Sequence, residues 1–377
     1  MRIGTIQILH WEHGRTASEL YKEALAKIAH ADQLGFYSAW LTEHHFPLAG
    51  VERPGYSINP DPLTFLSHAA ALTDRIRLGT GVMVLPWDDP VRTAERAAML
   101  DIFSDGRLEL GVGRGGARHE TKGFHVPSDH SRERFGEALD VLVNAWKDGP
   151  FTLHGEFQSH EDLNVFPKPV QSPPPIYVAA TSPESFAWVG RRGLPYCYVS
   201  GAWEPVETEV YQRQHRWYLE GAEEAGHDVS TLWHPQVLLL YCAETEAEAV
   251  EVAERHVAEF LRFSESHYQR GKYYKFLVKM FEDRAVQFPE YYKYVAPPRR
   301  PTNPDEAAEF AKEMIRRNLI GTPDSIVEKL NAYRESMTLD YLLAFTDWGA
   351  IPHDRVMRSM ELFAESVMPR FVNGDHG

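Results

Sequence analysis

The sequence GFYSAWLTEHHFP, residues 35–47, determines how the fold of this chain can be interpreted. It opens with a glycine that ends a helix-like segment, and residues 36–41 then form a short apolar run, which is typical of a buried parallel strand. Three ionisable residues, Glu43, His44 and His45, follow where that strand should end. Barrels of parallel strands carry their active sites at the carboxyl ends of the strands, so the cluster is well placed for catalysis. Taken alone, it would equally suit residues that only cap the strand and bond the loop backbone.

The composition indicates a soluble globular enzyme. The 377 residues are enough for a large α/β barrel with insertions, and the formal net charge of −15 disfavours nucleic acid and anionic membrane surfaces as partners. Both cysteines, Cys197 and Cys242, fall inside expected strands, so we expect no disulfide framework and a reducing cytoplasm. Residues 1–6 have the pattern of a strand rather than a signal peptide, and no apolar run is long enough to span a bilayer.

Strand-like and helix-like segments alternate along the chain. Eight apolar runs predict strands, at residues 2–9, 36–41, 76–85, 107–112, 176–180, 196–200, 235–242 and 339–345. Parallel strands need helical crossovers, and eight such repeats favour a closed (β/α)8 TIM barrel over an open doubly wound sheet. We therefore expect one α/β domain over residues 1–377, with insertions at about 150–175 before strand five and at about 264–303 before strand eight.

A glycine-rich turn follows the fourth expected strand, with the sequence Gly113-Arg114-Gly115-Gly116. Glycines let a ligand approach the backbone closely, and the Arg114 guanidinium can fork onto a phosphate or a carboxylate. The spacing matches neither a P-loop nor the dinucleotide-binding fingerprint. The alternative is a tight turn that exposes an arginine.

A second candidate anion site follows the fifth strand, where Thr181-Ser182-Pro183-Glu184-Ser185 should open a helix. Thr181 and Glu184 have the spacing of a capping box, and hydroxyls, free N–H groups and the helix dipole together attract an anion. The alternative is a well-capped helix without a ligand. Both motifs lie on the same face of the expected barrel, which favours a phosphorylated ligand, although barrel phosphate sites more often follow strands seven and eight.

A metal site is disfavoured at the Glu-His-His cluster. Neighbouring residues on a strand point in opposite directions, so His44 and His45 should not bind one ion together. Other histidines near strand ends show no metal-ligand spacing; they are His10, His13, His119, His125 and His130. We therefore predict no metal.

Considered together, these residues resemble the bacterial luciferase-like flavin monooxygenases, with the greatest likeness to the alpha chain of bacterial luciferase. The resemblance covers nearly the whole chain and rests on short motifs in a fixed order. They are Trp40-Leu41 with Glu43-His44-His45-Phe46, Val84-Leu85-Pro86 with Pro90-Val91-Arg92, Ser104 with Gly106-Arg107, Arg114-Gly115, Arg192-Gly193-Leu194-Pro195, Gly321-Thr322-Pro323, Leu362-Phe363 and Val367-Met368-Pro369. Each motif is common by itself, but their order is specific.

The resemblance implies a (β/α)8 barrel that binds reduced FMN at the carboxyl ends of its strands. Arg114, Ser182 and Ser185 would hold the phosphate, and Gly81 and Val82 would lie against the isoalloxazine ring, where this family often has a non-prolyl cis peptide. The complete set of cofactor-binding residues that it implies is Gly81, Val82, Gly113, Arg114, Ala180, Thr181, Ser182 and Ser185.

The activity that the resemblance implies is that of a two-component monooxygenase. A separate NAD(P)H-dependent flavin reductase would deliver reduced FMN, O2 would form a flavin hydroperoxide, and one oxygen atom would pass to a small organic substrate. His44, beside Glu43, would be the catalytic acid or base. The chain would act as a homodimer or a luciferase-like heterodimer. The rival activities are those of a flavin or deazaflavin oxidoreductase that transfers hydride without oxygen, and of a non-catalytic flavin-binding barrel.

The chain also departs from luciferase. Gly113 stands where luciferase has a reactive cysteine, Thr181 stands where it has a glutamate, and the insertion before strand eight is longer. These differences argue against light emission and against a long-chain aldehyde substrate. Deazaflavin-dependent relatives usually lack the Glu-His-His run, so the resemblance favours FMN.

Aromatic residues are concentrated near the expected active face. Four tryptophans follow strand ends and either wall an apolar pocket or pack the core: Trp11, Trp87, Trp203 and Trp348. Residues 264–303 are also rich in Tyr and Phe, and their Lys and Arg outnumber their acids. Long loops in such positions are often lids, and we expect a mobile lid that excludes water from the flavin. The alternative is a permanent subunit contact.

Overall fold

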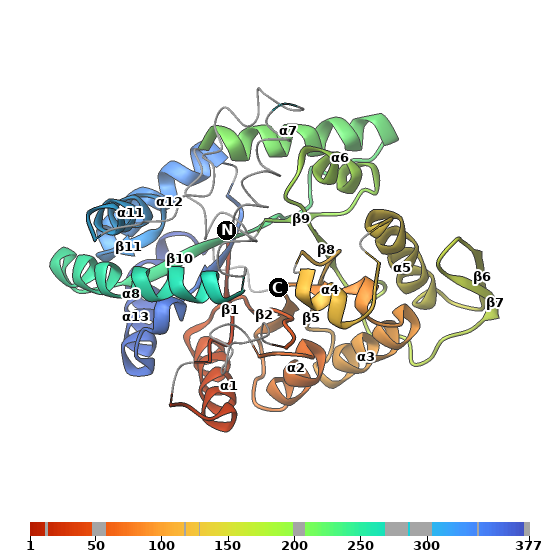
Figure 1. Cartoon of the computed structure of the whole chain (residues 1–377), viewed down its shortest axis with the longest axis horizontal. Coiled ribbons are helices and arrows are strands. Elements are labelled where there is room, and N and C mark those ends of the chain that lie inside the picture. The colour runs from red at the N-terminus through yellow and green to blue at the C-terminus, as the bar shows by residue number, and fades with distance from the viewer. Residues whose placement is uncertain are drawn as a thin grey trace.

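The computed structural model describes residues 1–11, 14–46, 58–116, 118–127, 129–198, 208–267, 286, 304–337 and 339–372. A curled sheet of ten strands runs through these residues, with hydrogen-bonded neighbours in the order β11, β10, β12, β1, β2, β3, β5, β8, β9, and with β4 beside β5. Its strand pairs are parallel. Helices surround the sheet, so the strands occupy the centre of the molecule (Figure 1).

The strands of the curled sheet are short, and most of their residues are buried. Near its two ends a single parallel bridge joins Tyr198 to Gln236. There the Tyr198 N–H donates to the Pro235 oxygen (2.9 Å) and the Val237 N–H donates to the Tyr198 oxygen (3.1 Å), which links β9 to β10. The strands are β1 (Arg2–Gln7), β2 (Ser38–Leu41), β3 (Arg77–Thr80), β4 (Met83–Val84), β5 (Leu108–Gly113), β8 (Ile176–Ala179), β9 (Tyr196–Cys197), β10 (Pro235–Cys242), β11 (Leu319–Gly321) and β12 (Tyr341–Phe345).

The helices begin and end at residues that suit helix termini. At α1, Thr16 and Glu19 form a reciprocal capping box and Gly35 ends the helix in the left-handed region (φ 82°). Aspartates cap α2 and α3, and each of these helices has proline in its first turn. The helices are α1 (Ala17–Leu34), α2 (Pro62–Ala70), α3 (Pro90–Phe103), α4 (Arg118–Gly123), α5 (Ser131–Ala145), α6 (Pro183–Arg191), α7 (Thr208–Ala225), α8 (Glu246–His267), α11 (Pro304–Arg317), α12 (Pro323–Met337) and α13 (His353–Ser366).

The predicted α/β architecture is confirmed as a curled, parallel sheet with helices around it. One predicted strand was wrong: residues 76–85 do not form a single strand. The cis peptide between Gly81 and Val82 interrupts the run, so that β3 ends before it and β4 begins after it. The cis peptide lies where the family resemblance suggested it. The short strand β11, which pairs with β10, was not anticipated because its three residues give no periodic pattern.

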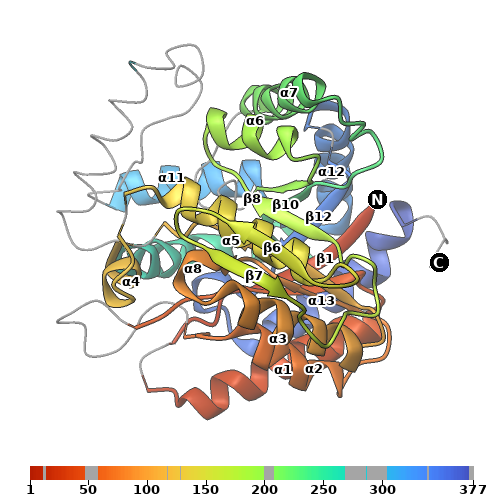
Figure 2. The same cartoon turned by 90° about the vertical axis from the view of Figure 1, so that its right-hand side faces the viewer.

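Within the predicted insertion at 150–175, the structure has an antiparallel hairpin of β6 (Phe151–His154) and β7 (Ser159–Leu163). The hairpin lies outside the curled sheet, next to α5 (Figure 2). Glu137 on α5 fixes it, because its carboxylate accepts backbone N–H groups of Glu156 (2.9 Å), Phe157 (2.7 Å) and Gln158 (2.8 Å).

The predicted insertion at 264–303 is helical at its start, because α8 continues to His267. Except for residue 286, its remainder lies outside the described residues, and so does the lid predicted for it. Trp203 also lies outside them.

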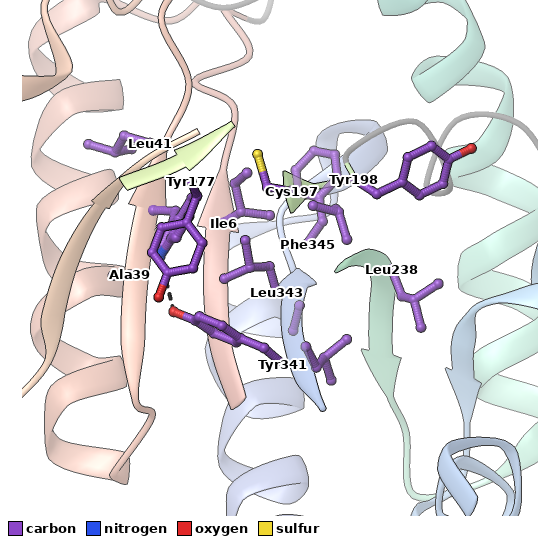
Figure 3. Close-up of a cluster of buried hydrophobic side chains, with 14 of the residues drawn as sticks. Ile6, Ala39, Leu41, Tyr177, Cys197, Tyr198, Leu238, Tyr341, Leu343 and Phe345 are labelled. Atoms are coloured by element: carbon purple, nitrogen blue, oxygen red, sulfur yellow. Dashed lines mark hydrogen bonds between the residues drawn. The ribbon is translucent and has the colours of Figure 1, made fainter. Parts of the chain in front are cut away.

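The interior of the curled sheet is built around Trp40 on β2, which is 1% exposed. A side chain at Gly79 would collide with the indole ring, and a Cβ at Gly111 would lie 2.9 Å from the Trp40 Cζ3 atom. The two glycines therefore leave the space that Trp40 fills. Other apolar side chains of the strands continue this core, among them Ile6, Leu343 and Phe345 (Figure 3).

A buried carboxylate, Glu109 on β5, ties the amino ends of several strands together. Its Oε2 atom accepts hydrogen bonds from the Tyr341 hydroxyl (2.5 Å) and the Trp40 Nε1 atom (3.0 Å). Its Oε1 atom accepts from the Arg77 Nε atom (3.2 Å) and the Tyr177 hydroxyl (3.3 Å). Because these partners belong to β12, β2, β3 and β8, one side chain joins five strands of the sheet.

The side chains around Glu109 keep the protonation states in which they can donate hydrogen bonds to its carboxylate. Burial, followed by the charge of Glu109, raises the pKa of Tyr341 well above its ordinary value and the pKa of Tyr177 in the same direction. Burial favours the neutral form of Arg77, but the nearby carboxylate outweighs it and the pKa of Arg77 is raised. The cluster therefore consists of neutral phenols and one cation around one carboxylate.

None of the helices in the described part of the chain is long and apolar enough to cross a membrane. Cys197 and Cys242 are buried, free thiols, and burial raises the pKa of each to about 12.

We expect removal of a tyrosine hydroxyl that donates to the Glu109 carboxylate to destabilise the fold more than removal of a tyrosine hydroxyl that donates to a neutral oxygen. Tyr341→Phe should lower the free energy of unfolding by about 1.5–3 kcal/mol, as for a hydrogen bond to a charged group. The control is Tyr21→Phe, whose half-buried hydroxyl donates to the neutral Ile58 oxygen (2.7 Å), with an expected loss of about 0.5–1.5 kcal/mol. Urea unfolding measures both, and equal losses would show that the carboxylate adds nothing.

Candidate functional site

The candidate site lies at the carboxyl edge of the sheet, where β2, β4, β5 and β8 end side by side. The strand register pairs Val112 with Met83 on one side and with Val178 on the other. The residues that follow these positions, including Arg114 and Ser182, therefore emerge at the same edge. The sequence-based expectation that the motifs after these strands share one face agrees with this register.

The end of β2 places His44 and His45 by backbone contacts. The His44 N–H donates to the Asn59 oxygen (3.0 Å), and the Asn59 side chain donates to the Thr42 oxygen (2.8 Å). Asn59 is 1% exposed, so this clamp is shielded from water. Its role could not be seen in the sequence, where Asn59 belongs to a loop rich in Pro, Gly and Asn.

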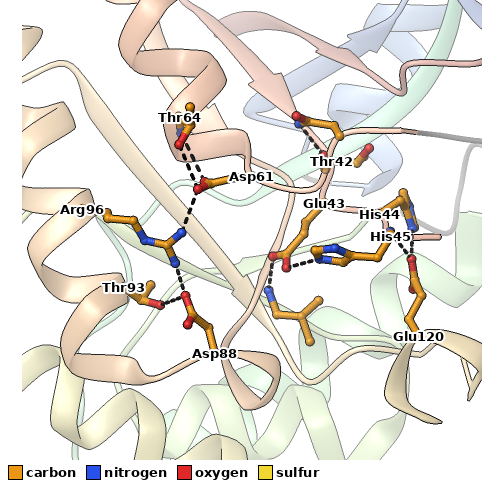
Figure 4. A network of polar contacts seen from close by, with 12 residues as sticks. Thr42, Glu43, His44, His45, Asp61, Thr64, Asp88, Thr93, Arg96 and Glu120 are labelled. Carbon is orange, nitrogen blue, oxygen red and sulfur yellow. Dashed lines mark hydrogen bonds and ion pairs between the residues drawn. The ribbon is translucent and has the colours of Figure 1, made fainter. Parts of the chain in front are cut away.

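Each histidine of the cluster contacts a different carboxylate (Figure 4). The His44 Nδ1 atom lies 3.3 Å from the Glu120 Oε1 atom, and the His45 Nε2 atom lies 2.8 Å from the Glu43 Oε1 atom. The resemblance implied a catalytic His44 beside Glu43. The structure instead pairs Glu43 with His45, because successive side chains at the end of a strand point to opposite sides.

Glu43 connects the end of β2 to β4. Its Oε2 atom accepts the backbone N–H of Val84 (2.7 Å), two residues after the cis peptide, while its Oε1 atom contacts His45. Glu43 is 7% exposed, and burial raises its pKa although the contacts with His45 and Val84 oppose the shift. Its position is that of a residue that orders backbone next to the predicted flavin contact.

An aromatic cluster surrounds the His45 ring. The ring centroid of Phe124 lies 4.5 Å from that of His45 in an edge-to-face arrangement, and the centroid of Trp87 lies 5.6 Å away. Trp87 and Phe124 are stacked on one another at 5.5 Å, and Phe46 lies 5.1 Å from Phe124. The cluster is partly exposed, since Phe46 is 46% exposed. For the tryptophans the sequence left two alternatives, the wall of an apolar pocket or packing of the core. Trp87 lies beside His45 in the candidate site.

The other described tryptophans pack the fold. Trp348 is fully buried and donates from its Nε1 atom to the Leu240 oxygen (3.1 Å). Trp11 is partly buried and donates to the Arg15 oxygen (2.7 Å).

The glycine-rich turn after β5 is narrow. A Cβ at Gly113 would lie 2.7 Å from the Val82 Cγ2 atom and 3.4 Å from the Ala179 Cβ atom. Three of the predicted cofactor-binding positions, Gly81, Val82 and Gly113, are therefore brought together beside the end of β8. A larger residue than Gly113 would not fit here without a shift of Val82.

Arg114 extends from this turn toward α5. Its Nη1 atom lies 3.5 Å from the Ser131 Oγ atom at the start of the helix, and its side chain is partly buried. Ser131 was not among the predicted site residues, because nothing in the sequence places it near Arg114. A guanidinium close to a serine hydroxyl at a helix start is suited to an anionic group.

The start of α6 differs in detail from the prediction. The N-cap is Ser182 rather than Thr181, and the Ser182 Oγ atom accepts the Ser185 N–H (3.3 Å). The capping box predicted from Thr181 and Glu184 was therefore wrong by one residue, and Thr181 is exposed. The Ser182 and Ser185 hydroxyls lie 2.7 Å apart and are buried, so both face the same small volume. Ala180, also predicted, is buried and donates its N–H to the Cys197 oxygen (3.2 Å).

Two further groups belong to the surroundings of His44. One is Glu120 on α4, and the other is His10, which follows β1 and is 5% exposed. Burial, followed by the charges of Lys27 and His44, lowers the pKa of His10 to about 3, so this imidazole is neutral. Among the described residues no three His, Cys, Asp or Glu side chains are grouped so that they could hold a metal ion.

Comparison with known proteins gives matches over nearly the whole chain. The family model described as luciferase-like monooxygenase matches residues 1–339. The oxygenase component of the flavin-dependent trigonelline monooxygenase of Acinetobacter baylyi is 28% identical over 364 residues, which cover 95% of this chain and 91% of that protein. The alkanal monooxygenase alpha chain of Photobacterium leiognathi is 26% identical over 383 residues, which cover 98% of each.

Solved structures show the same architecture. Monooxygenase RslO1 from Streptomyces bottropensis aligns with a TM-score of 0.76 at 26% identity, over 99% of this chain and 100% of that one. The oxygenating constituent of 3,6-diketocamphane monooxygenase of Pseudomonas putida, a type II Baeyer–Villiger monooxygenase in complex with FMN, aligns with a TM-score of 0.75 at 21% identity, over 99% of each chain. An F420-dependent secondary alcohol dehydrogenase aligns with a TM-score of 0.68 at 19% identity, over 99% of each chain. The last two likenesses concern the fold alone.

We expect Arg114→Ala to weaken the binding of reduced FMN by about 1.5–3 kcal/mol, because the variant would lose a hydrogen bond to a charged phosphate. Riboflavin, which lacks the phosphate, should bind the variant and the unaltered protein equally well. The control is Arg191→Ala, since Arg191 at the other end of α6 forms an exposed ion pair with Glu224 (3.1 Å). Anaerobic fluorescence titration measures the affinities. An unchanged FMN affinity in Arg114→Ala would remove this residue from the phosphate site.

Proposed function

Because the chain belongs to the family of luciferase-like monooxygenases, we propose that it is the oxygenase component of a two-component flavin-dependent monooxygenase. Its cofactor is reduced FMN, its oxidant is O2, and its substrate is a small organic molecule that receives one oxygen atom. A separate NAD(P)H-dependent reductase supplies the reduced flavin. The similarity to a relative named as an oxygenase component supports this division of labour.

The observation that carries the proposal is the meeting of two chemically different groups at one sheet edge. One is the imidazole of His44, 3.3 Å from a buried carboxylate. The other is the set of Arg114, Ser182 and Ser185, which offers a guanidinium and two adjacent hydroxyls at a helix start. The first suits proton transfer and the second suits a phosphate, as a reaction on a phosphorylated cofactor requires.

The residues present offer donors that suit the phosphate of FMN. The turn at Gly113 packs closely against Val82, so that the Gly81–Val82 backbone is held beside the end of β5, where the proposal places the flat ring. When bound, reduced FMN supplies the electrons that activate O2. Around it, Arg114, Ser182 and Ser185 bind and orient the phosphate. The aromatic cluster of Phe46, Trp87 and Phe124 walls one side of the site and limits the access of water.

His44 is the catalytic acid or base in this proposal, and Glu43 orders the backbone of β4 and the ring of His45. The proposal includes closure of the curled sheet into a (β/α)8 barrel, for which the bridge between Tyr198 and Gln236 is the support. It also includes association with a second chain, as a homodimer or a heterodimer, since one relative is named as an alpha chain. A cytoplasmic location agrees with the two free thiols.

The competing activity is hydride transfer from a flavin or deazaflavin without oxygen, which the fold-level likeness to an F420-dependent dehydrogenase keeps open. A screen of organic compounds by mass spectrometry, with an FMN reductase and 18O2, separates the two. We expect a product that gains one 18O atom, with uptake of one O2 per product. Substrate turnover under nitrogen, without label, would instead establish hydride transfer, and FMN binding without any product would indicate a binding protein.

We expect His44→Ala to retain reduced FMN while its turnover of the compound found in that screen falls by roughly a hundredfold or more, as for the loss of a general acid or base. His154→Ala serves as the control, because His154 is exposed on the β6–β7 hairpin, away from the sheet edge. Product formation is measured at saturating substrate, together with flavin affinity. A turnover equal to that of the unaltered protein would exclude His44 from catalysis.

A further inference from the structure

Glu120 lies next to the candidate catalytic histidine although the two are 76 residues apart in the sequence. It belongs to α4, a helix of six residues that follows the glycine-rich turn of Arg114. Its side chain is 1% exposed. Burial of a carboxylate is costly unless its oxygens accept hydrogen bonds, so the hydrogen bonds of Glu120 decide whether its burial is tolerated.

One oxygen of Glu120 makes the contacts with both His44 and His45. The Oε1 atom accepts the backbone N–H of His45 at 2.6 Å and lies 3.3 Å from the His44 Nδ1 atom. The Oε2 atom is buried and has no hydrogen-bond partner among the described residues. Because Oε1 accepts the His45 N–H, it acts as an acceptor toward His44 as well.

The carboxylate has a direct consequence for the imidazole. An ionised carboxylate only accepts hydrogen bonds, so a bond between it and His44 requires the proton to be on Nδ1. The neutral ring then keeps a lone pair on Nε2, the nitrogen that faces away from Glu120. A partner on one ring nitrogen fixes the tautomer in this way in catalytic and metal-binding histidines generally.

We infer that Glu120 is the positioning residue of His44. It holds the imidazole in the Nδ1–H form, so that Nε2 is the atom that accepts and returns a proton. The His45 N–H fixes the carboxylate in turn, so that the end of β2 and α4 are aligned by the same oxygen. The consequence for catalysis rests on the proposed function, whereas the tautomer itself does not.

A purely structural role is the competing explanation, in which Glu120 only joins α4 to the end of β2. The two explanations differ for Glu120→Gln. The amide oxygen can still accept the His45 N–H, so the loop should remain in place, but its hold on the Nδ1 proton is weaker than that of a carboxylate. A structural role predicts an unchanged imidazole, while a positioning role predicts a shift toward the Nε2–H form that free histidine favours.

The test begins with the cofactor-free protein, whose histidines are labelled with 15N and compared by NMR at neutral to slightly alkaline pH. The His44 signals are assigned by their loss in His44→Ala. We expect Nδ1 to carry the proton in the unaltered protein, and Glu120→Gln to raise the Nε2–H population several-fold. A matched control is Glu137→Gln, which also removes a carboxylate from backbone N–H groups but lies at the β6–β7 hairpin.

Kinetics with reduced FMN then connect the tautomer to turnover. Glu120→Gln should lower kcat on the order of tenfold with little change in KM, since part of the acid–base contribution of His44 is lost, and Glu120→Asp should restore part of it. In a His44→Ala background, Glu120→Gln should lower kcat no further, because it acts through His44. Glu137→Gln should leave kcat and the His44 signals unchanged.

The possible outcomes separate the two ideas. A proton on Nε2 in the unaltered protein, or signals of His44 that do not change in Glu120→Gln, would overturn the positioning role. Equal losses of kcat from Glu120→Gln with and without His44 would do the same. If instead His44→Ala keeps full turnover while the tautomer is as expected, the proposed function of His44 fails and the placement by Glu120 stands. Should Glu120→Gln not fold, the tautomer in the unaltered protein and in Glu120→Asp still decides the question.

Discussion

The buried carboxylate of Glu109 is the constraint on which the rest of the structure depends. It lies 0% exposed at the amino end of the sheet, where Trp40, Arg77 and Tyr341 donate to it from three other strands. A charge without such donors would be expensive to bury, so the strands can come together only in the arrangement that satisfies it. The amino ends of these strands are thereby held together, whereas the loops that follow their carboxyl ends are not under this constraint.

The buried carboxylates at the other end of the strands are arranged differently. Glu109 contacts four side chains from four strands, whereas Glu43 and Glu120 each contact one imidazole and one backbone N–H. The Glu43 carboxylate thus orders β4, and the Glu120 carboxylate orders the turn between β2 and its loop. A site made from loops needs such supports, because a loop does not have the ladder of hydrogen bonds that fixes a strand.

Local chemistry explains which parts of the fold could be predicted from the sequence. The bounds of α1 and α3 follow from local residues: a capping box and a terminal glycine at α1, and an aspartate before proline at α3. Strand β11 and the break at Gly81–Val82 could not be predicted from periodicity, because the first is too short and the second depends on the peptide geometry of one residue pair. The N-cap of α6 was displaced by one residue because Thr181 and Ser182 are both good caps.

Less of the candidate site than of the fold could be predicted from the sequence. The Glu-His-His run lies at the end of β2, as the sequence predicts, but adjacency in the sequence suggested Glu43 beside His44, and Glu43 contacts His45 instead. His44 contacts Glu120, which belongs to α4 and is separated from it by 76 residues. Such a pairing depends on how β2 and β5 are placed in the sheet, and one sequence without its structure contains no local signal for that.

The packing around Trp40 has an evolutionary consequence. Gly79 and Gly111 have no side chains at the points where the indole ring lies, and a Cβ at Gly81 would lie 3.3 Å from the same ring. Gly111 is also closed to a side chain by the Thr80 carbonyl oxygen, which would lie 2.0 Å from its Cβ. Gly79 and Trp40 therefore behave as one inherited unit: Gly79 cannot be enlarged while the indole is present, and a smaller residue at 40 would leave a void that a larger residue at 79 could fill. Descendants of this sequence should change these positions jointly or keep both, so drift here would proceed in rare coordinated steps even while the surface diverges freely.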